Sequence, residues 1–90
     1  MKTVESLINA NKKVYAKMSS DEICKAFFTQ AEREGFIFCD GAKPTTKHPS
    51  DLIAVLPDKT LCYVNAYGRI AMQSGAENII VYNLEKIFAD

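Results

Sequence analysis

The sequence lacks tryptophan, holds a single histidine, and has no excess of charge of either sign. Eleven Lys and Arg residues balance eleven Asp and Glu residues. A generic nucleic-acid binder needs a basic excess and an acidic mimic of DNA needs the opposite, so this balance argues against both classes. No window approaches the roughly 20 apolar residues of a membrane span, and the N-terminus lacks the apolar stretch of a signal peptide. We therefore expect a cytoplasmic protein without membrane contact.

Patterns typical of metal and disulfide sites are also missing. The three cysteines are Cys24, Cys39 and Cys62. Their odd number excludes a full disulfide framework, and no two of them form a Cys-x-x-Cys pair. A tetrahedral zinc site would need all three to converge with His48 from four separate segments. Each cysteine lies in an apolar run, where a free thiol behaves as a small hydrophobe. We expect reduced, buried cysteines, no metal and no cofactor.

Catalytic patterns are equally weak. Nucleophilic catalysis needs a base beside a Ser or Cys, but His48 lies in a Pro/Thr-rich stretch that is typical of an exposed loop. Asp40 and Asp51 flank this stretch and would have to face each other to act as an acid and a base. The glycines at 68 and 75 are isolated, which is typical of turns rather than of a phosphate-binding loop. The sequence therefore predicts a protein that is not an enzyme.

What the sequence does contain is the composition of one globular domain. Hydrophobic residues make up 48% of the chain, and five Phe and four Tyr residues supply aromatic bulk for a core. Such a composition excludes a disordered tail. Ninety residues are enough for one core and leave no room for a second. We expect a single domain over residues 1–90.

The clearest predicted element is a helix over residues 20–34. Ser19 is a candidate N-cap, and Glu22 follows three residues later, as in a capping box. Apolar residues recur at helical spacing along the segment. Gly35 is placed to end the helix in a left-handed conformation.

Alternating or β-branched segments predict strands on either side of this helix. The predicted strands are 12–18, 36–39, 51–56, 60–66 and 78–82. Short helices are expected at 4–10 and 84–88, and a further strand or bent ribbon at 68–77. Because hairpins and short links predominate, we expect a two-layer α+β fold. Its sheet would be mainly antiparallel, with four or five short strands and the principal helix on one face.

The stretch 41–50 is the first candidate for a binding site. It holds two prolines and no apolar period, and it is longer than a usual hairpin connection. Over-long loops in compact domains are often functional. Tyrosines on the neighbouring strand, and Tyr82 on the same sheet face, would supply an apolar anchor beside the charged loop. The candidate binding residues are Lys43, Lys47, His48, Tyr63, Tyr67 and Arg69. The competing interpretation is that such lysines only solvate exposed strands and block edge aggregation.

The chain from Lys12 onward resembles a set of small phage and mobile-element proteins. They share a lysine-bearing strand, a helix, a Gly-Phe-x-Phe/Trp-x-(Asp/Ser)-Gly step, a polar Pro/Thr loop, a hairpin and an Ile/Val-rich last strand. Here the step is GFIFCDG at 35–41 and the last strand is NIIVY at 78–82. The resemblance covers most of the chain, but it brings no catalytic residues. It implies an accessory role in phage–host conflict, of the anti-CRISPR or other anti-defence kind.

Two functions follow as expectations. The first is a non-enzymatic binding protein that inhibits a host defence complex by protein–protein contact, with a host protein or nucleoprotein complex as its partner in the host cytoplasm. Neutral charge argues against mimicry of DNA as its means. The alternative is a homodimeric binder of a small anionic ligand or nucleotide, a sponge built around Arg69 and the lysines. Salt dependence and thermal shifts with nucleotides distinguish the two.

Overall fold

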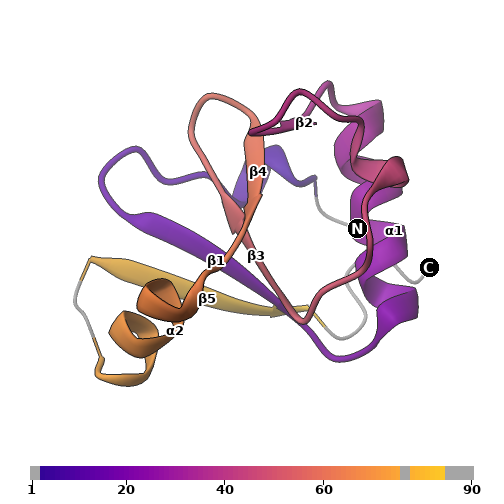
Figure 1. Ribbon diagram of the computed structural model, residues 1–90. Helices are drawn as coiled ribbons and strands as arrows, with labels where there is room; N and C mark the ends of the chain where they lie inside the picture. Colours follow the sequence, from indigo (N-terminus) through magenta and orange to yellow (C-terminus); the bar gives the residue numbers. More distant parts are fainter. Residues whose placement is uncertain (1–2, 76–77, 85–90) are drawn as a thin grey trace.

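The computed structural model describes residues 3–75 and 78–84 (Figure 1). Its helical elements are the 3₁₀ turns η1 (Glu5–Leu7) and η2 (Pro44–Thr46) and the helices α1 (Asp21–Arg33) and α2 (Ala66–Gln73). Its strands are β1 (Lys13–Met18), β2 (Ile37–Phe38), β3 (Leu52–Val55), β4 (Thr60–Tyr63) and β5 (Ile79–Leu84). The expected α+β domain with one main helix is confirmed. None of the described helices is long and apolar enough to cross a membrane.

The five strands form one mixed sheet in the order β2-β4-β3-β1-β5. The central pairs, β4 with β3 and β3 with β1, are antiparallel, and β3–β4 is the hairpin that the sequence predicted. Both edge strands run parallel to their neighbours. Parallel pairing needs a long connection. Here β2 is joined to β4 through η2 and β3, and all the elements from α1 to α2 lie between β1 and β5 in the chain.

Helix α1 packs its apolar side on the sheet. Ser20, one residue beyond the expected cap, accepts a hydrogen bond from the amide of Ile23 at 3.3 Å. The helix ends before Gly35, whose φ of +90° lies in the left-handed region. Phe27 and Phe28 are buried under the sheet, and the Phe28 and Phe38 rings meet edge to face at 5.5 Å. The helix-on-sheet core predicted from the sequence is confirmed.

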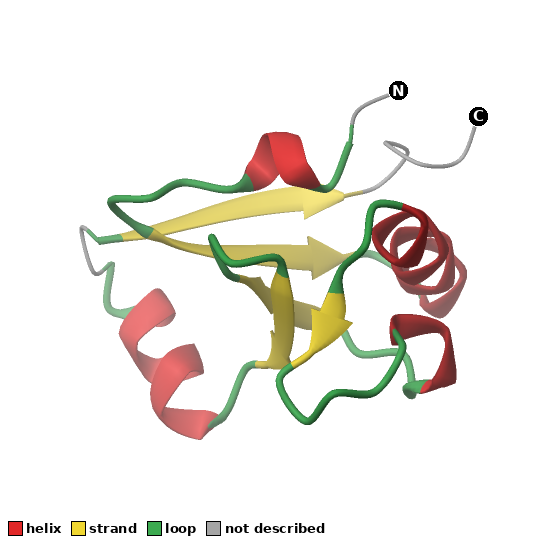
Figure 2. Ribbon diagram, turned by 90° about the horizontal axis from the view of Figure 1, so that it is seen from above, coloured by secondary structure: helices red, strands yellow, loops and turns green. Residues whose placement is uncertain are grey.

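The two faces of β1 have different neighbours. Val14, Ala16 and Met18 belong to the core under α1, as their alternation predicted. Tyr15 lies on the opposite face, which the alternation along 12–18 predicts as the outer face of a half-exposed strand, but it is 6% exposed. The reason is α2, which packs against this second face. In Figure 2 the two helices lie on opposite sides of the central strands.

Three other expectations need correction. Residues 66–73 form the helix α2 and not a strand or ribbon, so β4 ends at Tyr63 instead of residue 66. The N-terminal helix is reduced to the single turn η1. Leu84 is the last residue of β5, and the rest of the terminal helix expected at 84–88 lies outside the described residues.

The stretch 41–50 is a crossover and not a hairpin loop. It leads from β2 to β3, and these strands are separated in the sheet by β4. On the way, η2 packs beside α1, where the Thr45 hydroxyl donates to Glu32 Oε1 at 2.7 Å and Pro44 is buried. Its length therefore has a structural cause, and length alone is no sign of function.

Candidate functional site

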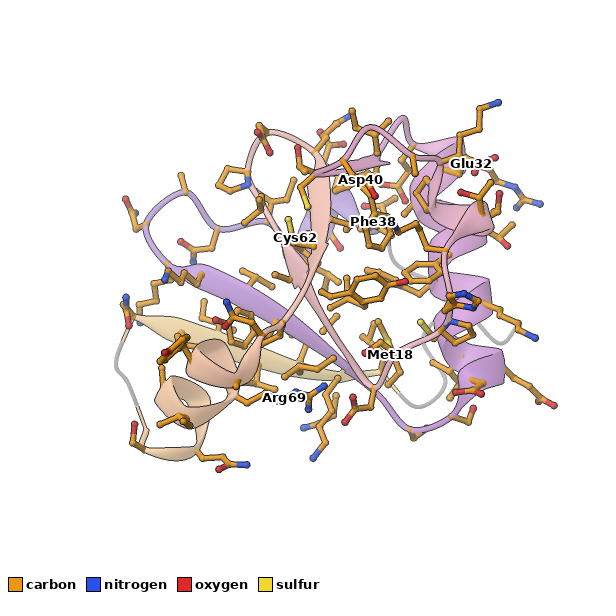
Figure 3. All side chains as sticks on the ribbon, viewed as in Figure 1. Met18, Glu32, Phe38, Asp40, Cys62 and Arg69 are labelled. Atoms are coloured by element: carbon orange, nitrogen blue, oxygen red, sulfur yellow. The ribbon has the colours of Figure 1, made fainter. Side chains whose placement is uncertain are left out.

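The six candidate residues form two separate groups. Lys47, His48 and Tyr63 lie together near β2, and Lys43 precedes η2 in the same crossover. Tyr67 and Arg69 lie on α2. In Figure 3, Asp40, the ion-pair partner of Lys47, lies near β2, and Arg69 lies apart from it beside α2. The sequence therefore identified residues of two surfaces and not of one site.

In the first group, the Lys47 ammonium is held within the chain. Its Nζ lies 2.7 Å from Asp40 Oδ2 and 5.1 Å and 5.6 Å from the ring centroids of Phe38 and Tyr63. The Tyr63 hydroxyl donates to the backbone oxygen of His48 at 2.8 Å. The hydrogen bond between the charged groups lowers the pKa of Asp40 and raises the pKa of Lys47. These contacts fix the crossover to the sheet, so they serve the fold first.

In the second group, Arg69 ties α2 to the beginning of β3. Its guanidinium makes two hydrogen bonds to Asp51, at 2.7 Å and 3.3 Å. The hydrogen bond from Arg69 lowers the pKa of Asp51, and the same contact raises the pKa of Arg69. Asp51 and Asp40, which flank the stretch 41–50, thus each have their own cationic partner. Such bidentate pairs orient both groups.

Helix α2 turns its smallest residues toward the sheet. A Cβ atom on Gly68 would lie 2.8 Å from Val64 Cγ1 and 2.9 Å from the Tyr15 hydroxyl oxygen. Asn65 caps the helix, because its Oδ1 accepts a hydrogen bond from the Gly68 amide at 2.8 Å. The close approach buries Tyr15 and leaves the outer side of α2 in solvent.

That outer side is apolar. Tyr67 is 84% exposed and Ile70 is 62% exposed, the two highest values among the large hydrophobic side chains described. They are three residues apart and so share one side of the helix. Between α2 and the sheet lies an open cavity of about 380 Å³, with Tyr67, Lys13 and Asn65 among its lining residues.

The tyrosines were expected to share one exposed sheet face, and in the structure they do not. Tyr63 points to the α1 side, where its ring centroid is 5.2 Å from that of Phe38. Tyr67 lies on α2 and not on a strand. Tyr82 is on β5, at the far edge of the sheet from β2. Tyr63 and Tyr67 come together only as lining residues of the cavity beside α2, to which Tyr82 does not belong.

The cysteines differ from one another in exposure. All three are free thiols in the structure, but only Cys24 is buried, and burial raises its pKa. Cys39 was expected to be buried and is exposed, because it follows the last residue of β2 and leaves the core. The parallel register pairs Phe38 with Leu61, and the next position on each strand brings Cys39 beside Cys62. Burial and the hydrogen bond with Cys39 raise the pKa of Cys62 to about 11.

We expect alkylating reagents to label Cys39 at least about tenfold faster than Cys62, because only the thiolate reacts. A pKa of about 11 leaves about one Cys62 in ten thousand ionised at pH 7. Iodoacetamide labelling of the native protein, followed by peptide mass spectrometry over time, measures both rates. Cys39→Ser provides the control for assigning the fast site. Equal rates at the two residues would contradict the exposure difference.

Among the described residues, no three His, Cys, Asp or Glu side chains gather in a way that could hold a metal ion. No family model, curated protein or solved structure matches the chain. The similarity of residues 35–41 and 78–82 to phage accessory proteins therefore stays a prediction. The candidate surfaces must be weighed on their geometry alone.

Proposed function

We propose that this chain is a non-enzymatic binding protein whose partner docks on the outer side of α2. The observation that carries the proposal is the pair Tyr67 and Ile70, 84% and 62% exposed on one side of the helix. Exposed apolar pairs of this kind are typical of binding surfaces, and tyrosine is enriched among the residues that dominate binding energy. Because the Asp51–Arg69 ion pair and the Asn65 cap hold α2 in place, little ordering entropy would be lost on binding.

The crossover at 41–50 is a weaker candidate for the docking surface than α2, because charged and polar groups of this segment already have partners within the chain. Lys47 already has a carboxylate partner and two aromatic rings, and the backbone oxygen of His48 accepts a hydrogen bond from Tyr63. A partner would have to replace these contacts before it gained new ones. Lys43 is exposed and adds a charge near this region. The tyrosine there, Tyr63, is 42% exposed, half the exposure of Tyr67, and it is already packed against Lys47 and Phe38.

The proposed partner is a protein with an apolar groove and an acidic rim. Lys13 and Lys17 alternate with Tyr15 along β1, so all three share the sheet face that α2 covers. Both lysines are exposed, and no ion pair is found for either among the described residues. Acidic side chains on the partner would complement them and speed association. The resemblance to anti-defence proteins makes a host defence complex the first partner to test.

We expect Tyr67→Ala combined with Ile70→Ala to weaken partner binding by about 30-fold or more, as removal of a residue central to an interface does. Proteins captured from host lysate by the wild type and by the variant would be identified by mass spectrometry. For each protein that the variant fails to capture, the affinity for the wild type and for the variant would then be measured directly. Ile37→Ala is the matched control, because Ile37 is 48% exposed on β2, away from α2. If the control loses the same proteins, or the double variant loses none, the proposal fails.

The cavity beside α2 supports a second function, the binding of a small anionic ligand. Its volume of about 380 Å³ is within the range of small-molecule sites, about 300–1,000 Å³. Lys13 supplies a cation there. Arg69, around which the sequence predicted such a ligand site, is not among the lining residues. Nucleotides would raise the melting temperature of the wild type but not of Lys13→Ala. Ile70→Ala, outside the cavity, would leave this shift intact.

A further inference from the structure

The six residues of the edge strand β5 include none of the side chains by which proteins block edge pairing. It is the outermost strand beyond β1 (Figure 1), and its six residues, IIVYNL, include no charge, proline or glycine. Among the described residues, no other strand pairs with its outer side. The opposite edge strand, β2, has two residues and offers almost nothing to pair with. A long, uncharged, β-branched edge is a template for another strand.

The parallel register with β1 identifies which backbone groups are available. The Lys13 amide donates to the Asn78 oxygen at 2.8 Å, and Lys13 is the register partner of Ile79. In a parallel ladder, hydrogen-bonding groups then alternate along the strand. The even-numbered residues of β5 turn their amides and carbonyls toward β1. The odd-numbered residues turn theirs outward, and these are Ile79, Val81 and Asn83.

We propose that β5 pairs with β5 of a second copy of this chain, antiparallel, to form a homodimer with one continuous sheet. With the two-fold axis at Val81, Val81 lies opposite its own copy and Ile79 lies opposite Asn83. All outward amides and carbonyls then find partners. A two-fold axis at Ile80 or Tyr82 would also bring outward groups opposite one another, but it would leave Asn83 or Ile79 without a partner inside the strand. A single register therefore satisfies the whole strand.

The side chains fit the same register. On the α1 side, Ile80 lies opposite Tyr82 of the other copy, an aromatic–β-branched pair of the kind that stabilises sheets. Ile80 is half-buried and Tyr82 is 36% exposed, so both have surface left to bury. No like charges meet, because β5 carries none.

A second copy of this chain is the favoured partner of the β5 edge because β5–β5 pairing closes the assembly. Pairing β5 of one copy with β2 of the next would leave new edges and build an open chain. The two-residue length of β2 makes that contact weak. Pairing β5 with itself covers both long edges at once and closes the assembly. The sides of the molecule that α2 and α1 cover remain free, so this dimer is independent of the proposed docking on α2.

The test is a charge swap at the two-fold axis, with mass measured by sedimentation velocity. Wild type is expected at twice the chain mass of 10.0 kDa at high micromolar concentration. Val81→Lys alone and Val81→Glu alone would each place like charges opposite one another, raising the dimer dissociation constant by about tenfold or more. An equimolar mixture of the two variants would recover the dimer. Val81→Thr, β-branched and uncharged, is the matched control and would remain dimeric.

A second measurement needs no variant. Amide hydrogen exchange at Ile79, Val81 and Asn83 is expected to slow as protein concentration rises, while the even-numbered amides of β5 stay protected at every concentration. A wild-type protein that remains monomeric at high micromolar concentration would overturn the proposal. So would a dimer that both charged variants retain. Since Tyr67→Ala with Ile70→Ala leaves β5 unchanged, that variant should still dimerise, which separates failure here from failure of the proposed function.

Discussion

Phe27→Ala is expected to destabilise the domain by about 3–5 kcal/mol, the usual cost of removing a buried phenylalanine ring. Phe27 is fully buried in α1, and its ring centroid lies 6.1 Å from that of Phe28. The neighbours that would have to fill the vacated space belong to α1 and to different strands. Because the net free energy of unfolding of a domain is only about 5–15 kcal/mol, the variant should be close to unfolding at room temperature.

Urea unfolding followed by circular dichroism measures this change. Lys25→Ala is the matched control on the same helix, because Lys25 is exposed and alanine favours helix formation. Its unfolding free energy should stay within about 0.5 kcal/mol of wild type. A Phe27→Ala protein as stable as this control would contradict the packing of α1 on the sheet.

Elements with strong local signals were predictable from the sequence. Around α1, a cap of Ser residues, a helical apolar period and Gly35 all agree, and the structure places the helix within one residue of the expected ends. The alternation in β1 and the two neighbouring strands predicted at 51–56 and 60–66 likewise correspond to elements of the structure, although β4 is shorter than predicted. In each case local preference and tertiary packing favour the same conformation.

Helix α2 was missed because its local signals conflict with its packing. Gly68 lies inside it, and glycine is unfavourable in helix interiors and typical of turns. The sequence does hold a signal for this helix, since Asn65 stands one residue before it as an N-cap. Gly68 and Ala71, three residues apart, mark the side that approaches the sheet. The role of that side depends on Tyr15, which lies beneath it on a distant strand and is not part of the local pattern.

The candidate site depended on contacts between distant segments, which local patterns do not encode. The pairing of Lys47 with Asp40 and of Arg69 with Asp51 follows from where the crossover and α2 fall on the sheet. The exposure of Cys39 depends on β2 ending one residue earlier than its apolar run. Which of the candidate residues lie together could therefore be known only from the order of the strands in the sheet.

Gly68→Ala is expected to destabilise the protein, although alanine is the better helix former. The added methyl group would lie 2.8 Å from Val64 Cγ1 and 2.9 Å from the Tyr15 hydroxyl, closer than carbon atoms approach in folded proteins. Overpacking of this kind costs about 1–3 kcal/mol, which outweighs the gain of about 1 kcal/mol from helix propensity. The sign of the change therefore reports how closely α2 approaches the sheet.

A double variant tests the cause of that change. Combining Gly68→Ala with Val64→Ala removes the closer of the two contacts, so part of the lost stability should return beyond the sum of the single effects. Gln73→Ala, an exposed position on the same helix, controls for helix propensity. Thermal unfolding of the wild type, the two single variants, the double variant and Gln73→Ala gives the comparison. If Gly68→Ala alone raised the melting temperature, α2 would have room to move against Tyr15, and the rigid display of Tyr67 and Ile70 on which the proposed docking depends would be lost with it.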